Sequence, residues 1–190
     1  MLIPDALNNL SLKGIIHVGA HHLEEKGLYE KLNLEVFWIE ANPNIAKLYP
    51  NVTCAAVSDK CEDVEFTISN NTQSSSLLKL KHHSIVYPDV VEIEKIKVTT
   101  TTLNNLIKNP EKYDALNLDI QGAELKALNG ATDILSFIKA VYTEVNQEEL
   151  YENCARIEEM DSFLKIHGFT RVLTKWEYNT GWGDALYRKL

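Results

Sequence analysis

The segment KGIIHVGAHHLEEKGLYEKLNLEVFWIEANP, residues 13–43, decides the fold. Its first apolar run, GIIHV (14–18), has the length and composition of a buried strand, and Gly19 follows it at a tight turn. A helical pattern leads to a second apolar run, EVFWIE (35–40), which ends on a glutamate. The order strand, turn, helix, strand is typical of a parallel sheet that is covered by helices.

The same alternation continues along the chain, and three further apolar runs have the length of strands. They are VTCAAV (52–57), DALNLD (114–119) and IKAVYTE (138–144). Helical patterns cover residues 21–32, 43–49, 122–130 and 148–167. Because continuous apolar runs indicate strands that are buried on both sides, we predict an α/β fold with a mainly parallel sheet and helices on both faces.

Two other pairs of segments have different patterns. Residues 65–69 and 91–100 alternate apolar and polar side chains, which predicts the half-exposed strands of an inserted or edge hairpin. Residues 169–175 and 184–189 flank a glycine-containing turn, and we expect them to form a closing antiparallel pair. An antiparallel edge on an otherwise parallel sheet is common.

Composition excludes several classes of protein. The 190 residues, 45% of them hydrophobic, suit a single domain over residues 1–190. The net charge of −8 and the lack of a basic block argue against nucleic-acid binding, because neutralising phosphates needs clustered lysine and arginine. The three cysteines form no CxxC pair, so we expect reduced, structural thiols. Since no apolar run approaches about 20 residues and no signal pattern is seen, we expect a cytoplasmic protein without a membrane span.

The predicted strand ends carry mostly polar residues or glycine, and in open α/β sheets ligands bind outside the carboxyl ends of the strands. Gly19 permits a close backbone approach, and Glu40 lies where a carboxylate accepts hydrogen bonds from ribose hydroxyls. The full G-x-G-x-x-G pattern of dinucleotide sites is missing, which favours a nucleoside without phosphate, such as S-adenosylmethionine. The alternative is that Gly19 is a steric requirement of the turn and Glu40 a solvated strand end.

Several short stretches, taken in order, resemble the FkbM family of S-adenosylmethionine-dependent methyltransferases. They are IIHVGAH (15–21), FWIEANP (37–43), AAVSDK (55–60), SSSL (74–77), VTTTTLNNL (98–106), LNLDIQGAELKALNGA (116–131), TEVN (143–146) and GDALYRK (183–189). The resemblance implies a Rossmann-like methyltransferase fold with a seven-stranded sheet and an antiparallel C-terminal strand. It also implies methyl transfer to a hydroxyl of a small acceptor, such as a sugar or glycan.

The resemblance also implies which residues bind the cofactor. They are His17, Gly19, Ala20, Glu40, Ala41, Ser58, Asp59 and Asp119. Gly19 and Ala20 would line its methionine part, Glu40 would bind its ribose, and Ser58 with Asp59 would contact its adenine. The chain departs from the family pattern at four positions. His17 stands where the family usually has an acidic residue, and Leu23 stands where it usually has a small residue. Lysine and glutamate are common in the family where Asn117 and Gln121 occur.

Asp119 and Glu144 are the candidate catalytic residues. Methyl transfer from a sulfonium is an in-line displacement, so the protein has to align the reactants and remove the hydroxyl proton. Asp119 ends an apolar strand, where a carboxylate needs a partner or a function, and we expect it to be the base. Helix capping is the structural alternative for Asp119. The candidate acceptor-binding residues are Ser75, Ser76, Gln121 and Trp182, for which a polar loop and aromatic packing are the alternatives.

Metal binding and other functions are less favoured. The paired histidines point apart on a helix, so they do not predict a zinc site. Magnesium bound by Asp119 and Glu144 is conceivable because hard cations take carboxylate oxygens, but it is not favoured. A binding module that keeps the fold without activity is the main alternative function. An NAD-dependent oxidoreductase is disfavoured by the missing glycines and the short chain.

Overall fold

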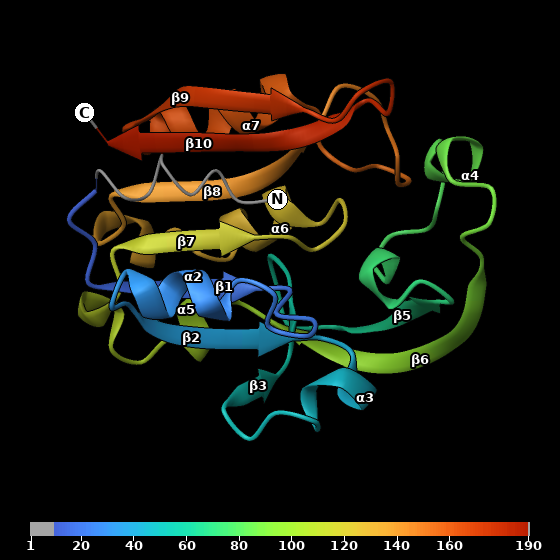
Figure 1. Ribbon diagram of the computed structural model, residues 1–190, viewed down its shortest axis with the longest axis horizontal. Helices are drawn as coiled ribbons and strands as arrows, with labels where there is room; N and C mark the ends of the chain where they lie inside the picture. The colour runs from blue at the N-terminus through green and yellow to red at the C-terminus, as the bar shows by residue number, and fades with distance from the viewer. Residues whose placement is uncertain (1–9, 190) are drawn as a thin grey trace.

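The structure is a computed structural model that describes residues 10–189; residues 1–9 and 190 of the predicted domain lie outside the described residues. Its main sheet has seven strands in the order β3-β2-β1-β7-β8-β10-β9 (Figure 1). In chain order they are β1 (Gly14–Val18), β2 (Glu35–Glu40), β3 (Val52–Cys54), β7 (Ala115–Leu118), β8 (Ala140–Asn146), β9 (Phe169–Trp176) and β10 (Trp182–Lys189). β10 runs antiparallel to both of its neighbours, and the other pairs are parallel, which confirms the predicted fold class.

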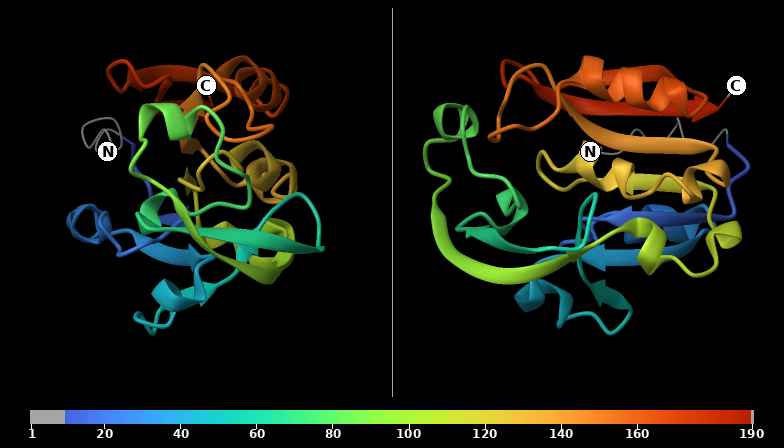
Figure 2. Two further views of the ribbon diagram at one scale, coloured as in Figure 1. Left: turned by 90° about the vertical axis from the view of Figure 1, so that its right-hand side faces the viewer. Right: turned by 180° about the vertical axis from the view of Figure 1, so that it is seen from behind.

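Helices cover both faces of this sheet (Figure 2). One face carries α2 (Lys26–Lys31), and the other carries α5 (Leu103–Leu106), α6 (Glu124–Asn129) and α7 (Ile157–Ile166). Successive residues of a strand point to opposite faces, so Ile15 packs in the cluster under α2 and Ile16 in the cluster under α7. Both are fully buried, which explains why the strands are continuous apolar runs.

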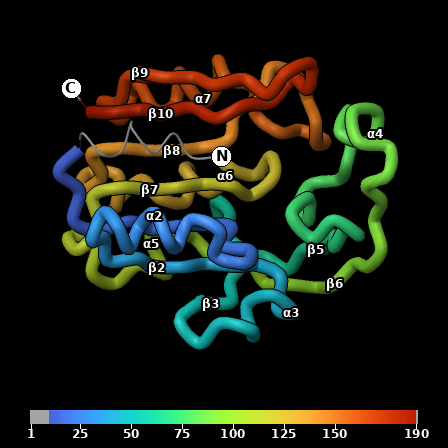
Figure 3. The backbone as a smooth tube through the Cα atoms, viewed as in Figure 1, coloured from blue at the N-terminus to red at the C-terminus, as the bar shows by residue number. Residues whose placement is uncertain are grey.

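A smaller three-stranded sheet stands at the carboxyl edge of the main sheet (Figures 1 and 3). It contains β4 (Ala56–Val57), β5 (Asp63–Ser69) and β6 (Glu92–Thr101), with η1 (Thr72–Ser74) and α4 (His83–Val86) between the last two. β5 and β6 are antiparallel, so the predicted hairpin is confirmed. We call β5, η1, α4 and β6 the lobe; it projects beyond the ends of β1 and β2.

The predicted strand over residues 52–57 is wrong, because it is two strands in two sheets. β3 pairs with β2, and the amide of Ala55 donates to the carbonyl of Glu40 at 3.0 Å. The chain then leaves the main sheet, and β4 pairs with β6. This change of sheet brings the lobe beside the carboxyl edge.

All four predicted helices are longer than the observed ones, and the one over 122–130 forms α6 (Glu124–Asn129). Residues 43–49 form only α3 (Pro43–Ala46). The helix predicted over 21–32 begins only at Lys26, because His21 and Leu23 have φ values of 39° and 61°, which do not fit a right-handed helix. The predicted helix over 148–167 begins only at Ile157. The apolar residues before it, Leu150, Tyr151 and Cys154, instead pack in a separate cluster with Leu78, Leu80, Val86 and Trp182. The remaining short 3₁₀ turns are η2 (Pro110–Lys112) and η3 (Ile134–Ser136).

Two smaller observations complete the fold. Trp38 is buried against Tyr29 of α2, with ring centroids 5.4 Å apart, as expected for a core tryptophan that faces a helix. Among the described residues, no helix has the length and apolar character needed to cross a bilayer.

Candidate functional site

The candidate site is a cavity of about 710 Å³ between the carboxyl edge of the main sheet and the lobe. In the sheet, β2 and β3 lie on one side of β1, and β7 and β8 lie on the other. The strand order therefore reverses between β1 and β7. Ligands of open α/β sheets bind at such a switch point. The cavity wall includes residues that follow β1, β2 and β7, the end of β8 and the start of β10.

Gly19 holds the loop after β1 against the loop after β7. Its φ is +91°, and a Cβ atom added to it would lie 1.8 Å from the carbonyl oxygen of Asp119. The amide of Gly19 donates to the carbonyl of Ile39 at 2.9 Å. A side chain at this position would therefore separate the two strand ends that flank the cavity.

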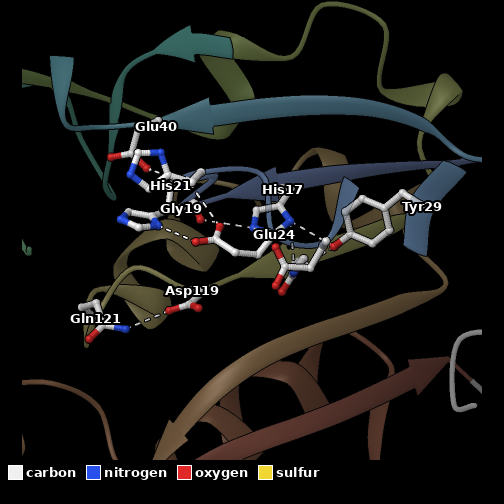
Figure 4. Close-up of polar contacts among 11 residues, drawn as sticks. His17, Gly19, His21, Glu24, Tyr29, Glu40, Asp119 and Gln121 are labelled. Atoms are coloured by element: carbon white, nitrogen blue, oxygen red, sulfur yellow. Dashed lines mark hydrogen bonds and ion pairs between the residues drawn. The ribbon is translucent and has the colours of Figure 1, made fainter. Parts of the chain in front are cut away.

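Glu40 ends β2 and projects its carboxylate to the cavity (Figure 4). One oxygen accepts from the amide of His21 at 2.9 Å, and the other accepts from the amide of Asn42 at 2.7 Å. Burial raises the pKa of this carboxyl, although the two backbone donors oppose the effect. A carboxylate has about four acceptor positions, so these two contacts leave acceptor capacity for a ligand.

Asp119 and Glu144 are joined through one side chain, that of Gln121. The Nε2 amide of Gln121 donates to Asp119 at 2.8 Å and to Glu144 at 3.1 Å (Figure 4 shows the first contact). The hydroxyl of Tyr151 donates to the Oε1 atom of Gln121. Gln121 has a φ of +57°, and its carbonyl accepts from the Ser76 hydroxyl at 2.8 Å. The strained loop thus aims the amide at both carboxylates.

The carboxylates at this end of the cavity oppose one another's ionisation. Burial, and then the charges of Glu124, Asp119 and Asp184, raise the pKa of Glu144 well above its usual value. Burial also raises the pKa of Asp119, while the hydrogen bond from Gln121 lowers it. Both shifts are upward, so this group of neighbouring carboxylates holds a proton more readily than a free carboxyl does.

Glu124 keeps the loop before α6 in place and gives a testable prediction. One of its oxygens accepts from the amides of Ile120 and Gly122 at 3.0 and 3.1 Å, and burial raises its pKa to about 7. Between about pH 4.5 and 7 the folded protein therefore binds more protons than the unfolded chain. The contribution of Glu124 to the free energy of unfolding thus falls as the pH rises through this range. We expect Glu124→Gln, which retains an acceptor oxygen, to be more stable than the wild type at pH 8 by about 1–3 kcal/mol.

Urea unfolding between pH 5 and 8 measures this difference. Glu111→Gln, which makes the same charge change on exposed η2, is the control and is expected to keep the wild-type pH dependence. If Glu124→Gln showed the wild-type slope of stability against pH, the raised pKa of Glu124 would not be the cause.

The structure brings many of the sequence-predicted site residues to one cavity. Its wall contains Gly19, Glu40, Ala41, Ser75, Asp119, Gln121, Glu144 and Trp182. Other predicted residues are not part of the wall. Ala20 is buried in the core, and Ser58 lies under Gly130, whose added Cβ atom would be 2.2 Å from the Ser58 carbonyl oxygen. Asp59 is exposed beside Ser58 and accepts from the Ser58 hydroxyl at 3.0 Å. Ser76 is also outside the wall, and its hydroxyl donates to the Gln121 carbonyl. The ligand contacts expected of these four residues stay predictions.

A family model described as the methyltransferase FkbM domain matches residues 17–171. The chain belongs to the FkbM methyltransferase family. It is 30% identical over 146 residues to the 2-O-methyltransferase NoeI of Sinorhizobium fredii (strain NBRC 101917 / NGR234), an alignment that covers 70% of this chain and 57% of that protein.

Solved structures show the same fold at low sequence identity. Magnesium protoporphyrin IX methyltransferase of Synechocystis PCC 6803, solved with bound S-adenosylmethionine, matches 98% of this chain and 74% of its own, at a TM-score of 0.50 and 10% identity. An S-adenosylmethionine-dependent methyltransferase of Clostridium acetobutylicum ATCC 824 matches 96% of this chain and 86% of its own, at 0.50 and 8%. These matches support the Rossmann-like fold.

His17 stands where the FkbM family usually has an acidic residue, and the structure shows how the chain accommodates it. The ring is buried; its Nε2 donates to the Gly19 carbonyl at 3.2 Å, so Nδ1 is the acceptor for the hydroxyl of Tyr29 at 3.0 Å (Figure 4). Asn117, a second departure, lies 3.1 Å from the same Nδ1 and donates to Tyr29 at 2.9 Å. Burial lowers the pKa of His17 to about 4, so it is neutral and holds Gly19 from behind the cavity wall.

Several residues of this FkbM-family cavity were missed by the sequence analysis. They are Glu24, Glu25, Phe66, His83, Tyr87, Tyr151 and Asp184. Tyr151 was hidden by the wrong helix assignment, and the residues of the lobe have no local pattern that points to a site. Asp184 faces Glu144 in the register of β8 and β10, which the predicted closing strand pair could have indicated. Among the described residues, no group of three or more His, Cys, Asp or Glu side chains is arranged to hold a metal ion.

Proposed function

We propose that this chain is an S-adenosylmethionine-dependent O-methyltransferase that acts on a hydroxyl of a small acceptor, a sugar or a glycan. The observation that carries the proposal is the single cavity at the switch point, which contains both Glu40 and Asp119. Membership of the FkbM family supports methyl transfer. The relative named as a 2-O-methyltransferase supports a hydroxyl as the acceptor.

The cavity residues fit the chemical groups of this cofactor. The carboxylate of Glu40 has acceptor positions for the two ribose hydroxyls. Ala55, Val57 and Phe66 supply an apolar wall suited to adenine, in place of the Ser58 and Asp59 contacts predicted from the sequence. Glu25, on the loop before α2, adds a carboxylate for a cationic group.

The residues at the other end of the cavity are suited to remove a proton. The bound cofactor would supply a methyl group on a positively charged sulfur, which leaves as a neutral thioether. Asp119 accepts the acceptor's hydroxyl proton while the hydroxyl oxygen forms the new bond to the methyl carbon. The raised pKa of Asp119 strengthens it as a base, and Gln121 fixes its direction. Glu144 supplies a second polar contact for the acceptor.

The proposal is tested by incubating the protein with methyl-labelled S-adenosylmethionine and a panel of sugars. We expect labelled, methylated product from at least one sugar, together with a rise in melting temperature on addition of S-adenosylhomocysteine. A protein that neither methylates nor is stabilised by the cofactor product would contradict the proposal. That result would favour a binding module that keeps the fold without activity.

Glu40 provides a prediction for cofactor binding. Glu40→Gln removes the negative charge that would bind the ribose hydroxyls, so we expect the Kd for S-adenosylhomocysteine to rise by about 10- to 100-fold. Isothermal titration calorimetry measures this change. The matched control is Glu35→Gln, at the exposed opposite end of the same strand, which is expected to leave the Kd unchanged. Equal affinities for wild type and Glu40→Gln would remove Glu40 from the cofactor site.

A further inference from the structure

His21, in the loop after β1, makes three polar contacts on the cavity wall. Its amide donates to Glu40 at 2.9 Å, and Nδ1 of its ring lies 2.7 Å from Oε1 of Glu24 (Figure 4). Nε2 of the same ring lies 2.8 Å from the hydroxyl of Thr72 in η1. Because a carboxylate only accepts, Nδ1 donates to Glu24, while the Thr72 hydroxyl can either donate to Nε2 or accept from it. All four residues line the cavity.

The backbone of His21 adopts a conformation that its side-chain contacts can explain. Its φ is 39°, a left-handed value that is uncommon for residues other than glycine. Such values persist where the surrounding contacts hold them, and they gather at ligand sites. The two ring contacts hold His21 from two directions, and the same conformation directs its amide to the carboxylate of Glu40. The ring of His21 thus supports Glu40 through the backbone.

The contact with Thr72 fixes one end of a lobe segment that crosses the switch point. Four residues further along the chain, the hydroxyl of Ser76 donates at 2.8 Å to the carbonyl of Gln121 in the loop after β7. We call residues 71–76 the strap. It is hydrogen-bonded to the loops that follow β1 and β7, the two strands between which the strand order reverses. Residues 71–75 of the strap line the cavity.

The strap lies beside the part of the cavity that is proposed for the nucleoside. Glu40, the proposed ribose ligand, contacts the same histidine that holds Thr72. The apolar wall proposed for adenine includes Phe66 of β5, the strand that leads into the strap. A nucleoside between Glu40 and Phe66 would be bordered by the strap, so a strap that opens more often would release it sooner.

We propose that His21 is a positioning residue for the cofactor, which holds the strap closed over the nucleoside through Thr72 and keeps Glu40 in place through its amide. This inference rests on the proposed methyltransferase function. The protein with a closed strap is the form that binds the nucleoside, so the affinity falls with the fraction of closed protein. The ring of His21 raises this fraction without contacting the reacting atoms.

Two substitutions of His21 separate the contact with the strap from the conformation of the backbone. An asparagine amide reaches no farther than the position of Nδ1, so His21→Asn keeps a polar group near Glu24 and loses the contact with Thr72. A glutamine amide reaches the position of Nε2, so His21→Gln keeps a donor for the Thr72 hydroxyl. Asparagine tolerates a positive φ better than glutamine does. A role in the backbone alone would therefore make His21→Gln the more damaged variant.

Surface plasmon resonance on the immobilised protein measures the dissociation rate and the Kd of S-adenosylhomocysteine. We expect His21→Asn and Thr72→Val to raise both quantities by at least about fivefold, the usual effect of losing one hydrogen bond. His21→Gln should stay within about twofold of the wild type. The matched control is His22→Asn, the same change at the neighbouring residue, whose ring contacts Tyr49 outside the cavity wall. This control should bind as the wild type does.

Three results would overturn the inference: a wild-type dissociation rate in His21→Asn, a wild-type rate in Thr72→Val, or faster dissociation from His21→Gln than from His21→Asn. Thr72→Val changes no residue of the loop after β1, so it tests the strap contact even if the His21 variants lose stability. Failure of the wild-type protein to bind S-adenosylhomocysteine would overturn the methyltransferase function itself, and this inference with it.

Discussion

Replacing Asp119 with asparagine is expected to lower kcat for methyl transfer by about 10²- to 10⁴-fold, the usual contribution of a positioned base. Asparagine has the same shape and can still accept from Gln121 Nε2, so the network around it should persist. It cannot accept the hydroxyl proton. Because the proposed cofactor contacts lie mainly on the β1 and β2 side, the Kd for S-adenosylhomocysteine should change little.

Single-turnover rates with labelled S-adenosylmethionine measure this effect, and Glu144→Gln is the informative comparison. Glu144 is proposed to contact the acceptor without taking its proton, so its amide variant should lose much less activity than Asp119→Asn. A wild-type rate in Asp119→Asn would show that Asp119 is not the base. If Glu144→Gln were the more damaged variant, the two roles would have to be exchanged.

Gly19→Ala is the second change with a large expected effect. A Cβ atom at this position would lie 1.8 Å from the Asp119 carbonyl oxygen, and the φ of +91° strains any L side chain. The strand ends must therefore separate, and we expect the free energy of unfolding to fall by about 3 kcal/mol or more. For a chain of this length, that corresponds to a melting temperature lower by roughly 10 °C. The cofactor product should also stabilise the variant less than the wild type.

Gly27→Ala is the matched control, since both variants add one methyl group to a glycine near the same loop. Nothing lies within 4 Å of an added Cβ atom at Gly27, which is inside α2. This variant should be more stable than the wild type by about 0.5–1 kcal/mol, because alanine favours helix. A Gly19→Ala protein as stable as wild type would mean that the β1 and β7 ends are not in the close contact described here.

The sequence predicted the main sheet because its physical causes are local. Strands such as β1 are covered by helices on both faces, so nearly every position is apolar. The lobe strand β6 is half exposed, so apolar and polar side chains alternate along it, and this local pattern was visible in the sequence. The candidate site was predicted in part because Gly19, Glu40 and Asp119 end buried strands or directly follow them. Ligands of open α/β sheets bind at these carboxyl ends of the strands.

The remaining features depend on contacts between distant segments. Tyr151 precedes a helix and looks like part of it in sequence, but it packs with the lobe and reaches Gln121. Ser58 lies at a strand end like Glu40, yet it is buried beside Gly130, which is 72 positions away, and is not part of the cavity wall. The role of His17 depends on Asn117, 100 positions away, and no local pattern reports that pair.

A structure of the protein with S-adenosylhomocysteine tests whether the cavity is the cofactor site. We expect one nucleoside in the cavity, with its ribose hydroxyls hydrogen-bonded to Glu40 and its sulfur directed to the end that contains Asp119. Glu40 is the discriminating contact, because it is the only proposed ribose ligand. A nucleoside bound elsewhere, or one in the cavity that contacts neither Glu40 nor the Asp119 end, would show that the cofactor does not bind as proposed.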